Sequence, residues 1–177
     1  MLKKSNRQKL LNLFFTDPSP QYQLREICRK IRLSPKSVKN YLEELSKEGL
    51  IRITKHRVHE YPLYQANRDD PLFRLLKRNE LILEIKETGL LDLLNDRYMP
   101  DVIILFGSAS RGEDTNESDI DLFLQCKGDK TEFRSAEHQL NRKINLFFSE
   151  DFNKLSSELK NNIINGIKLR GYLKIWG

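Results

Sequence analysis

The chain has 177 residues, of which 38% are hydrophobic and 32% charged, and its formal net charge at pH 7 is +6. No apolar run approaches the roughly 20 residues of a transmembrane helix, and the charged first ten residues lack the apolar core of a secretory signal. We therefore exclude a membrane protein and expect a globular, cytoplasmic one with a single medium domain or two small ones.

Charge is distributed unevenly along the chain. Residues 1–68 contain 15 Lys and Arg against six Asp and Glu, whereas residues 69–177 contain 16 against 19. A basic first third and a mildly acidic remainder indicate two units with different partners, and the basic unit is suited to a polyanion. A small lysine-rich domain that is merely well solvated would have the same composition, so charge alone does not decide between the two interpretations.

The first 50 residues predict helices in succession. Apolar residues recur at helical spacing over residues 7–15 and again over residues 24–31. Ser34 and Pro35 then form a helix start, because serine caps free amides and proline is favoured at the first helical position. Gly49 ends that third helix.

After Gly49, the apolar residues no longer recur at helical spacing but alternate with polar residues. Residues 50–53 and 61–64 predict two paired strands around a basic tip at residues 54–59. Pro62 lacks an N–H group, so we expect it at a sheet edge. Helices followed by a two-stranded ribbon resemble the winged helix-turn-helix of transcription regulators, over about residues 5–66.

The winged-helix resemblance implies a DNA-binding function. The helix that begins at Ser34 would enter the major groove, and the ribbon tip would reach the backbone or the minor groove. Winged helices also serve as protein-docking modules, so that alternative stays open, as does a homodimer on a pseudo-palindromic site. The residues expected to contact DNA are Lys36, Ser37, Lys39, Asn40, Lys55 and Arg57.

A polar connector separates this unit from the next. Asp70 and Pro71 open a helix whose apolar positions continue to Ile85, and a short helix from Leu90 to Leu94 follows. We place the domain boundary in the connector. The predicted domains are a DNA-binding domain at residues 1–67 and a second domain, including the connector helix, at residues 68–177.

The second unit contains a motif at the end of an apolar strand. The predicted strand Val102–Phe106 runs directly into Gly107 and Ser108. A glycine lets the backbone approach a ligand closely, and the serine hydroxyl and nearby amides can hold phosphate oxygens. Arg111 would add a cationic donor to the same phosphates.

Two aspartates follow after a gap of ten residues. Asp119 and Asp121 flank Ile120 on a second predicted strand, residues 118–124, and alternation puts both carboxylates on one face. Two carboxylates on one rigid face are a hard-oxygen site for Mg²⁺. Buried without a cation, they would repel each other at a cost of several kcal/mol, so the pair is either exposed or metal-bound.

This combination of residues resembles a known signature. An apolar strand, Gly-Ser, a gap of about ten residues and Asp-Ile-Asp resemble the DNA polymerase beta-type nucleotidyltransferases, in particular their minimal branch, over about residues 72–177. The resemblance implies an α+β domain with a mixed sheet and helices on one face. It also implies Gly107 and Ser108 on the triphosphate of an NTP, with ATP favoured, and Asp119 and Asp121 on Mg²⁺. By family analogy, a HEPN-type protein is a candidate partner.

The match departs from the family at its third carboxylate. That acid corresponds to Asn145, on the predicted strand Lys143–Phe148. Asparagine offers a carbonyl oxygen but carries no charge and cannot act as a base. Two functions therefore stay open: Mg²⁺-dependent transfer of a nucleoside monophosphate to a hydroxyl acceptor, such as a protein, or a transcription regulator whose degenerate domain only binds nucleotide or a partner protein. Whether the chain is an enzyme depends on Asn145.

Two further elements are expected after that strand. Apolar spacing predicts one helix from Asp151 to Ile164. Gly166 then leads into a closing strand, predicted from Ile167 to Trp176. These elements would complete the sheet domain.

Overall fold

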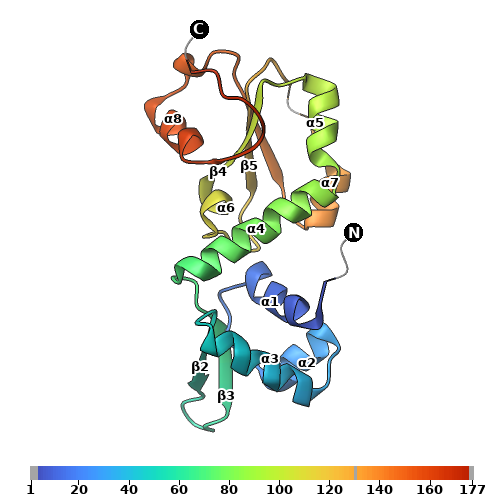
Figure 1. Ribbon diagram of the computed structural model, residues 1–177, viewed down its shortest axis with the longest axis vertical. Helices are drawn as coiled ribbons and strands as arrows, with labels where there is room; N and C mark the ends of the chain where they lie inside the picture. Colours follow the sequence, from blue (N-terminus) through green and yellow to red (C-terminus); the bar gives the residue numbers. More distant parts are fainter. Residues whose placement is uncertain (1–3, 130, 176–177) are drawn as a thin grey trace. The chain divides into compact units, whose positions relative to one another are not determined.

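The computed structural model describes residues 4–129 and 131–175 (Figure 1). The chain divides into two compact units, Met1–Lys77 and Arg78–Gly177. The division falls inside helix α4 (Pro71–Glu87), because its first half contributes Phe73 to one core while its second half contributes Leu81 and Ile85 to another. The sequence analysis instead placed the boundary after residue 67, in the polar connector that precedes this helix.

The described part of the first unit combines helices with a small antiparallel sheet. Ser34 caps α3 by accepting a hydrogen bond at Oγ from the Ser37 amide at 3.3 Å, and Pro35 is the first helical residue, as predicted. The helices are α1 (Asn6–Thr16), α2 (Leu24–Ile31) and α3 (Pro35–Lys47), and the strands are β1 (Tyr22–Gln23), β2 (Ile51–Lys55) and β3 (Pro62–Ala66).

The short strand β1 was not foreseen, and it changes the place of Pro62. Tyr22 pairs with Tyr64 and Gln23 with Leu63, so the sheet order is β1-β3-β2 and β3 is the central strand. The expectation of Pro62 on an edge strand is therefore wrong. Pro62 is the first residue of β3, opposite Lys55 and beyond the pairing with β1, where a missing N–H group disturbs no β1 hydrogen bond.

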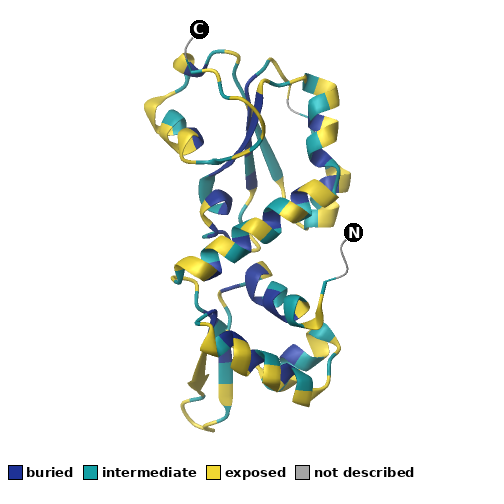
Figure 2. Cartoon of the chain, viewed as in Figure 1, coloured by how far each residue is buried: buried dark blue, intermediate teal, exposed yellow. Residues whose placement is uncertain are grey.

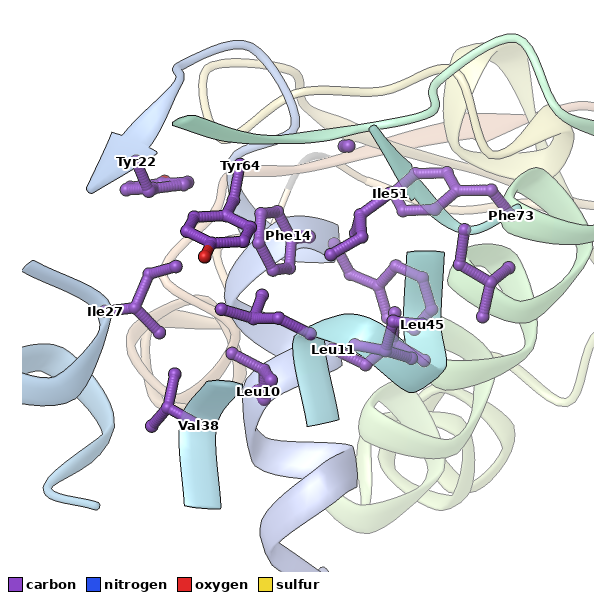
Figure 3. Packing of buried hydrophobic residues seen from close by; sticks show 14 residues of the cluster. Leu10, Leu11, Phe14, Tyr22, Ile27, Val38, Leu45, Ile51, Tyr64 and Phe73 are labelled. Atoms are coloured by element: carbon purple, nitrogen blue, oxygen red, sulfur yellow. The ribbon is translucent and has the colours of Figure 1, made fainter. Parts of the chain in front are cut away.

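The core of the first unit is built from the apolar faces of these helices and the sheet (Figure 3). The ring of Phe14 meets that of Tyr22 edge to face, with centroids 5.7 Å apart. Burial, together with the nearby carboxylates of Asp17 and Glu26, raises the pKa of Tyr22 to about 12. Its phenol therefore stays neutral throughout the physiological pH range and packs as a core residue.

The second unit is an α+β domain, and its described residues form a four-stranded mixed sheet in the order β6-β5-β4-β7. Strands β5 and β6 run parallel, whereas β4 is antiparallel to both β5 and β7. In chain order, the elements that follow α4 are α5 (Leu90–Tyr98), β4 (Val102–Phe106), α6 (Gly107–Arg111), β5 (Ile120–Leu124), α7 (Arg134–Leu140), β6 (Ile144–Phe148), η1 (Phe152–Lys154), α8 (Ser157–Ile164) and β7 (Ile167–Gly171).

Both faces of this sheet are covered, so the prediction of helices on one face is wrong. On one face, Ile103 and Leu105 of β4 join a core with residues of α4, α5 and α7. On the other face, Val102, Ile104 and Phe106 join a core with residues of η1 and α8. The physical reason is visible in β4, whose five residues are all apolar and buried (Figure 2), since such a strand needs cover on both sides.

The segment after β6 also differs from the prediction. The expected single helix over residues 151–164 is divided into η1 and α8, because Ser156 starts α8 as its N-cap, accepting a hydrogen bond from the Leu159 amide at 3.3 Å. The closing strand ends at Gly171, whose φ is +76°. The predicted end of that strand, Trp176, lies outside the described residues. Across the described part of the chain, the helices lack the length and apolar character that a bilayer crossing needs.

Candidate functional site

Asp119 and Asp121 lie where the chain enters β5. Asp121 is the second residue of the strand and is half-buried, while Asp119 precedes the strand and is exposed. Ile120, Leu122 and Leu124 are buried in the core on the opposite face. The predicted alternation is confirmed, and the two carboxylates share one face.

Asn145 lies between these two carboxylates. Asn145 of β6 pairs with Asp121 of β5 in the parallel register of these two strands. Its Nδ2 donates one hydrogen bond to Asp119 Oδ2 at 3.1 Å and another to Asp121 Oδ1 at 3.0 Å. The amide thus lies beside both carboxylates, at the position that the family resemblance assigned to the third acid. Its positive N–H groups offset the repulsion between two like charges that share one site.

Gly107 brings the turn after β4 against the Asp121 carboxylate. Phe106 pairs with Asp121 across the sheet, and Gly107 follows with φ +72°. A Cβ atom built on Gly107 would lie 2.7 Å from Asp121 Oδ2, so only glycine permits this approach. Ser108 comes next and is half-buried. Buried Ser110, which sequence analysis missed, donates from Oγ to the Gly107 carbonyl at 2.8 Å and holds the turn.

Arg111, the last residue of α6, forms an ion pair at the surface of the unit. Its Nε donates to Glu113 Oε2 at 2.8 Å, and both side chains are partly exposed to solvent. The structure therefore places Arg111 just after the glycine turn with a carboxylate partner. Its predicted contact with phosphate remains a prediction.

A comparison of the sequence with known families found a match that includes this strand, the glycine turn and the acidic neighbouring strand. Residues 89–172 match a family model described as Polymerase beta, Nucleotidyltransferase. The match supports the nucleotidyltransferase superfamily. It covers the part of the chain from α5 to just after β7, including the whole Gly-Ser and Asp-Ile-Asp motif. A search of curated proteins found no match.

The donor atoms of Asp119, Asp121 and Asn145 fit a hard divalent cation. Among the described residues, no group of three or more His, Cys, Asp and Glu side chains gathers in a metal-binding arrangement. The cluster instead offers two carboxylates and one amide, and oxygen ligands of this kind suit Mg²⁺. Asp119 and Asp121 would hold the ion. Asn145 could contribute its carbonyl oxygen only by turning its amide away from the two hydrogen bonds described above.

A polar cleft adjoins Asp119. It has a volume of about 450 Å³ and is lined by residues 116–119, Glu137 and residues 141–143. Carboxylate, amide and ammonium groups all contribute to its walls. The cleft therefore provides a hydrated, hydrogen-bonding surface directly beside the acidic pair.

Arg142 fixes the loop that leads to Asp119, and sequence analysis missed it. Its side chain is only 10% exposed and forms an ion pair with Asp114, which is 4% exposed, at 2.6 Å. It also donates from Nε to the Ser118 carbonyl at 2.7 Å and from Nη2 to the Asp119 carbonyl at 3.0 Å. By sequence alone, an aspartate in a polar loop and an arginine before a strand are ordinary surface residues. Only the fold brings them together.

We predict that Arg142→Met destabilises the protein by about 3 kcal/mol, because removing one partner of a buried ion pair leaves the other charge without compensation. Urea unfolding of the full chain measures this change. Arg134→Met is the matched control, since Arg134 forms an exposed ion pair with Glu132 and should leave the unfolding curve unchanged. Equal unfolding midpoints for the two variants would contradict a structural role for Arg142.

The residues predicted to bind DNA all lie in the first unit. Lys36, Lys39 and Asn40 are exposed on the first turns of α3. Lys39 Nζ lies 3.9 Å from Glu43 Oε1, an exposed contact that water screens. Ser37 is half-buried, and its hydroxyl lies 3.0 Å from that of Ser34 within the helix cap, so it is the least available of the four.

The tip of the β2–β3 hairpin is basic and ordered by stacked rings. Lys55 ends β2 and Arg57 lies in the turn, and both are exposed. The His56 ring stacks on Tyr61 with centroids 4.7 Å apart and on His59 at 5.2 Å. These stacked rings pack the two sides of the tip together, which leaves the cationic side chains facing solvent.

Proposed function

We propose that the protein is a Mg²⁺-dependent nucleotidyltransferase joined to a DNA-binding winged helix. The second unit would transfer a nucleoside monophosphate from an NTP, with ATP favoured, to a hydroxyl acceptor such as one on a protein. The observation that carries this proposal is the convergence of Gly107 on Asp121, with Asp119 on the same face. The agreement of residues 89–172 with the nucleotidyltransferase family supports the reaction class.

Each residue of the site would contribute a specific part of the reaction. The backbone at Gly107 and Ser108 would hold phosphate oxygens through its amides. Asp119 and Asp121 would bind Mg²⁺, which when bound neutralises phosphate charge and favours in-line attack on the α-phosphate. The polar cleft beside Asp119 would admit the acceptor, so its hydroxyl would meet the site from the Asp119 side.

Transfer of label from α-labelled ATP tests this function directly. The full chain is incubated with Mg²⁺ and with either itself or a cell lysate as the source of acceptor. Transfer of label to a protein, nucleic acid or small molecule, with release of pyrophosphate, is the expected result. If the wild type binds ATP but transfers nothing under any of these conditions, the enzymatic proposal fails and nucleotide binding alone remains.

A regulator that binds nucleotide without transferring it is the second candidate. The Asn145 amide favours it, because an N–H group directed at both carboxylates can neither accept a proton nor add negative charge. In that case the second unit would sense nucleotide or a partner protein, and the first unit would respond at DNA. Nucleotide-dependent DNA affinity in the absence of transfer would be its distinguishing property.

The winged-helix proposal for the first unit has its own support. Three helices and the β2–β3 ribbon have the expected order within residues 4–66, and the helix that would enter the groove begins with exposed Lys36, Lys39 and Asn40. The excess of basic residues in this unit favours a polyanion. A homodimer, a HEPN-type partner and a cytoplasmic location belong to the same proposal.

Replacing Lys36 and Lys39 together by alanine is expected to weaken DNA binding at every sequence. Each lost phosphate contact should also reduce the slope of log K against log salt by about 1. Fluorescence anisotropy with duplex DNA over a salt series measures both effects. Lys47→Ala, an exposed lysine at the other end of α3, is the control that should leave the slope unchanged. Identical slopes for all variants would contradict binding through the start of α3.

A further inference from the structure

Phe147 is an aromatic side chain that stays partly exposed on the face of the candidate site. It belongs to β6, at an edge of the sheet, and is 38% exposed. Ile144, Leu146 and Phe148 of the same strand pack against the core on the opposite face. Since side chains alternate along a strand, Phe147 shares its face with Asn145, and therefore with the two aspartates.

The Phe147 ring is supported by a buried aromatic residue next to the glycine turn. Its centroid lies 5.2 Å from that of Phe106, with the ring planes at 70°, an edge-to-face arrangement. Phe106 is only 5% exposed, pairs with Asp121 across the sheet and directly precedes Gly107. Phe147 is therefore held in place by the strand that carries the phosphate-binding turn.

We propose that Phe147 is a stacking platform for the nucleobase of the bound nucleotide. This inference rests on the proposed function, because it assumes phosphates at Gly107 and a cation at the aspartates. Phe147 lies two residues beyond Asn145, about 6.6 Å along the strand. A ribose joins the α-phosphate to the base, so a nucleotide held at the acidic pair can extend its base over this ring.

The chemistry of the surroundings favours a base at Phe147 over an acceptor. An exposed aromatic face stacks on any nucleobase with little dependence on its hydrogen-bonding pattern. The cleft beside Asp119 is lined by carboxylate, amide and cationic groups, which suit a hydroxyl-bearing acceptor better than a flat apolar ring. The cleft adjoins Asp119, and Phe147 shares the sheet face of Asp121 and Asn145, so the proposal assigns one substrate to each surface.

The platform is tested by comparing the affinities of the wild type and of Phe147→Leu for two ligands. Calorimetry with Mg²⁺ present measures affinity for ATP and for inorganic tripolyphosphate, which has phosphates but no base. We expect Phe147→Leu to weaken ATP binding about tenfold, as loss of one base–aromatic stack does, and to leave tripolyphosphate binding unchanged. Phe147→Trp should restore ATP affinity, because it restores an aromatic face.

Tyr172→Leu is the matched control for loss of an exposed aromatic ring. Tyr172 is 73% exposed and its amide donates to the Asp101 carbonyl, at the end of β4 opposite the glycine turn. It should leave both affinities unchanged. Unchanged ATP affinity in Phe147→Leu, or an equal loss for both ligands, would overturn the platform. Wild type that binds neither ligand would instead refute the proposed function.

Discussion

Asp119→Ala is expected to abolish transfer of label from α-labelled ATP and to lower Mg²⁺ affinity by on the order of 100-fold, because it removes one of two anionic oxygen ligands. Asp119 is exposed and precedes β5, so its removal should leave the fold intact. The hydrogen bond from Asn145 to Asp121 also remains possible in the variant. Calorimetric titration with Mg²⁺ and the labelling assay measure the two effects separately.

Asp92→Ala provides a matched control for the loss of one carboxylate. Asp92 is exposed in the same unit and pairs with Arg170. This variant has the same change in net charge as Asp119→Ala and should keep both metal affinity and labelling. If Asp119→Ala retained wild-type Mg²⁺ affinity, the cation would not lie at the acidic pair, and the proposal of metal-dependent transfer would lose its basis.

Two features of the site could be predicted from the sequence because each of them is local. The strand Val102–Phe106 is entirely apolar, and the glycine after it marks a turn whatever the rest of the fold. The alternation around Ile120 then determines which face Asp119 and Asp121 share. These features depend on neighbours in the chain, and the structure has them as predicted.

Features that depend on contacts between distant segments could not be predicted in this way. Arg142 and Asp114 are 28 positions apart, and neither belongs to a periodic pattern. The division of residues 151–164 into η1 and α8 depends on the Ser156 cap, which the apolar spacing does not show. The two-residue strand β1 is too short to show any alternation, and its pairing with β3 is what places Pro62 at the start of a central strand.

Asn145→Asp is expected to have opposite effects on metal binding and on metal-free stability. A carboxylate in place of the amide would lie within about 3 Å of both neighbouring carboxylates, where the Asn145 N–H groups now donate at 3.1 and 3.0 Å. We expect Mg²⁺ affinity to rise by about tenfold or more, since the cation gains a third anionic ligand. Without Mg²⁺, we expect the free energy of unfolding to fall by about 2 kcal/mol at neutral pH.

The pH dependence of the Asn145→Asp variant distinguishes charge repulsion from lost packing. Like-charge repulsion disfavours the ionised form of a carboxyl in the folded state, so the destabilisation is full at neutral pH and is lost as the pH falls to the range where aspartate is protonated in the unfolded chain. Urea unfolding at several pH values, with and without Mg²⁺, follows this change. Saturating Mg²⁺ should restore the stability at neutral pH.

Asn145→Leu separates the charge of the introduced carboxylate from the loss of the two amide hydrogen bonds. It removes both hydrogen bonds of Asn145 without adding charge, so Mg²⁺ should not recover its stability and its Mg²⁺ affinity should not rise. A gain in labelling in Asn145→Asp but not in Asn145→Leu would mean that the missing carboxylate limits the reaction. If Asn145→Asp changed neither metal affinity nor stability, the hydrogen bonds of Asn145 to the acidic pair would not contribute to the free energy of unfolding. The cation would then have to bind elsewhere on the unit.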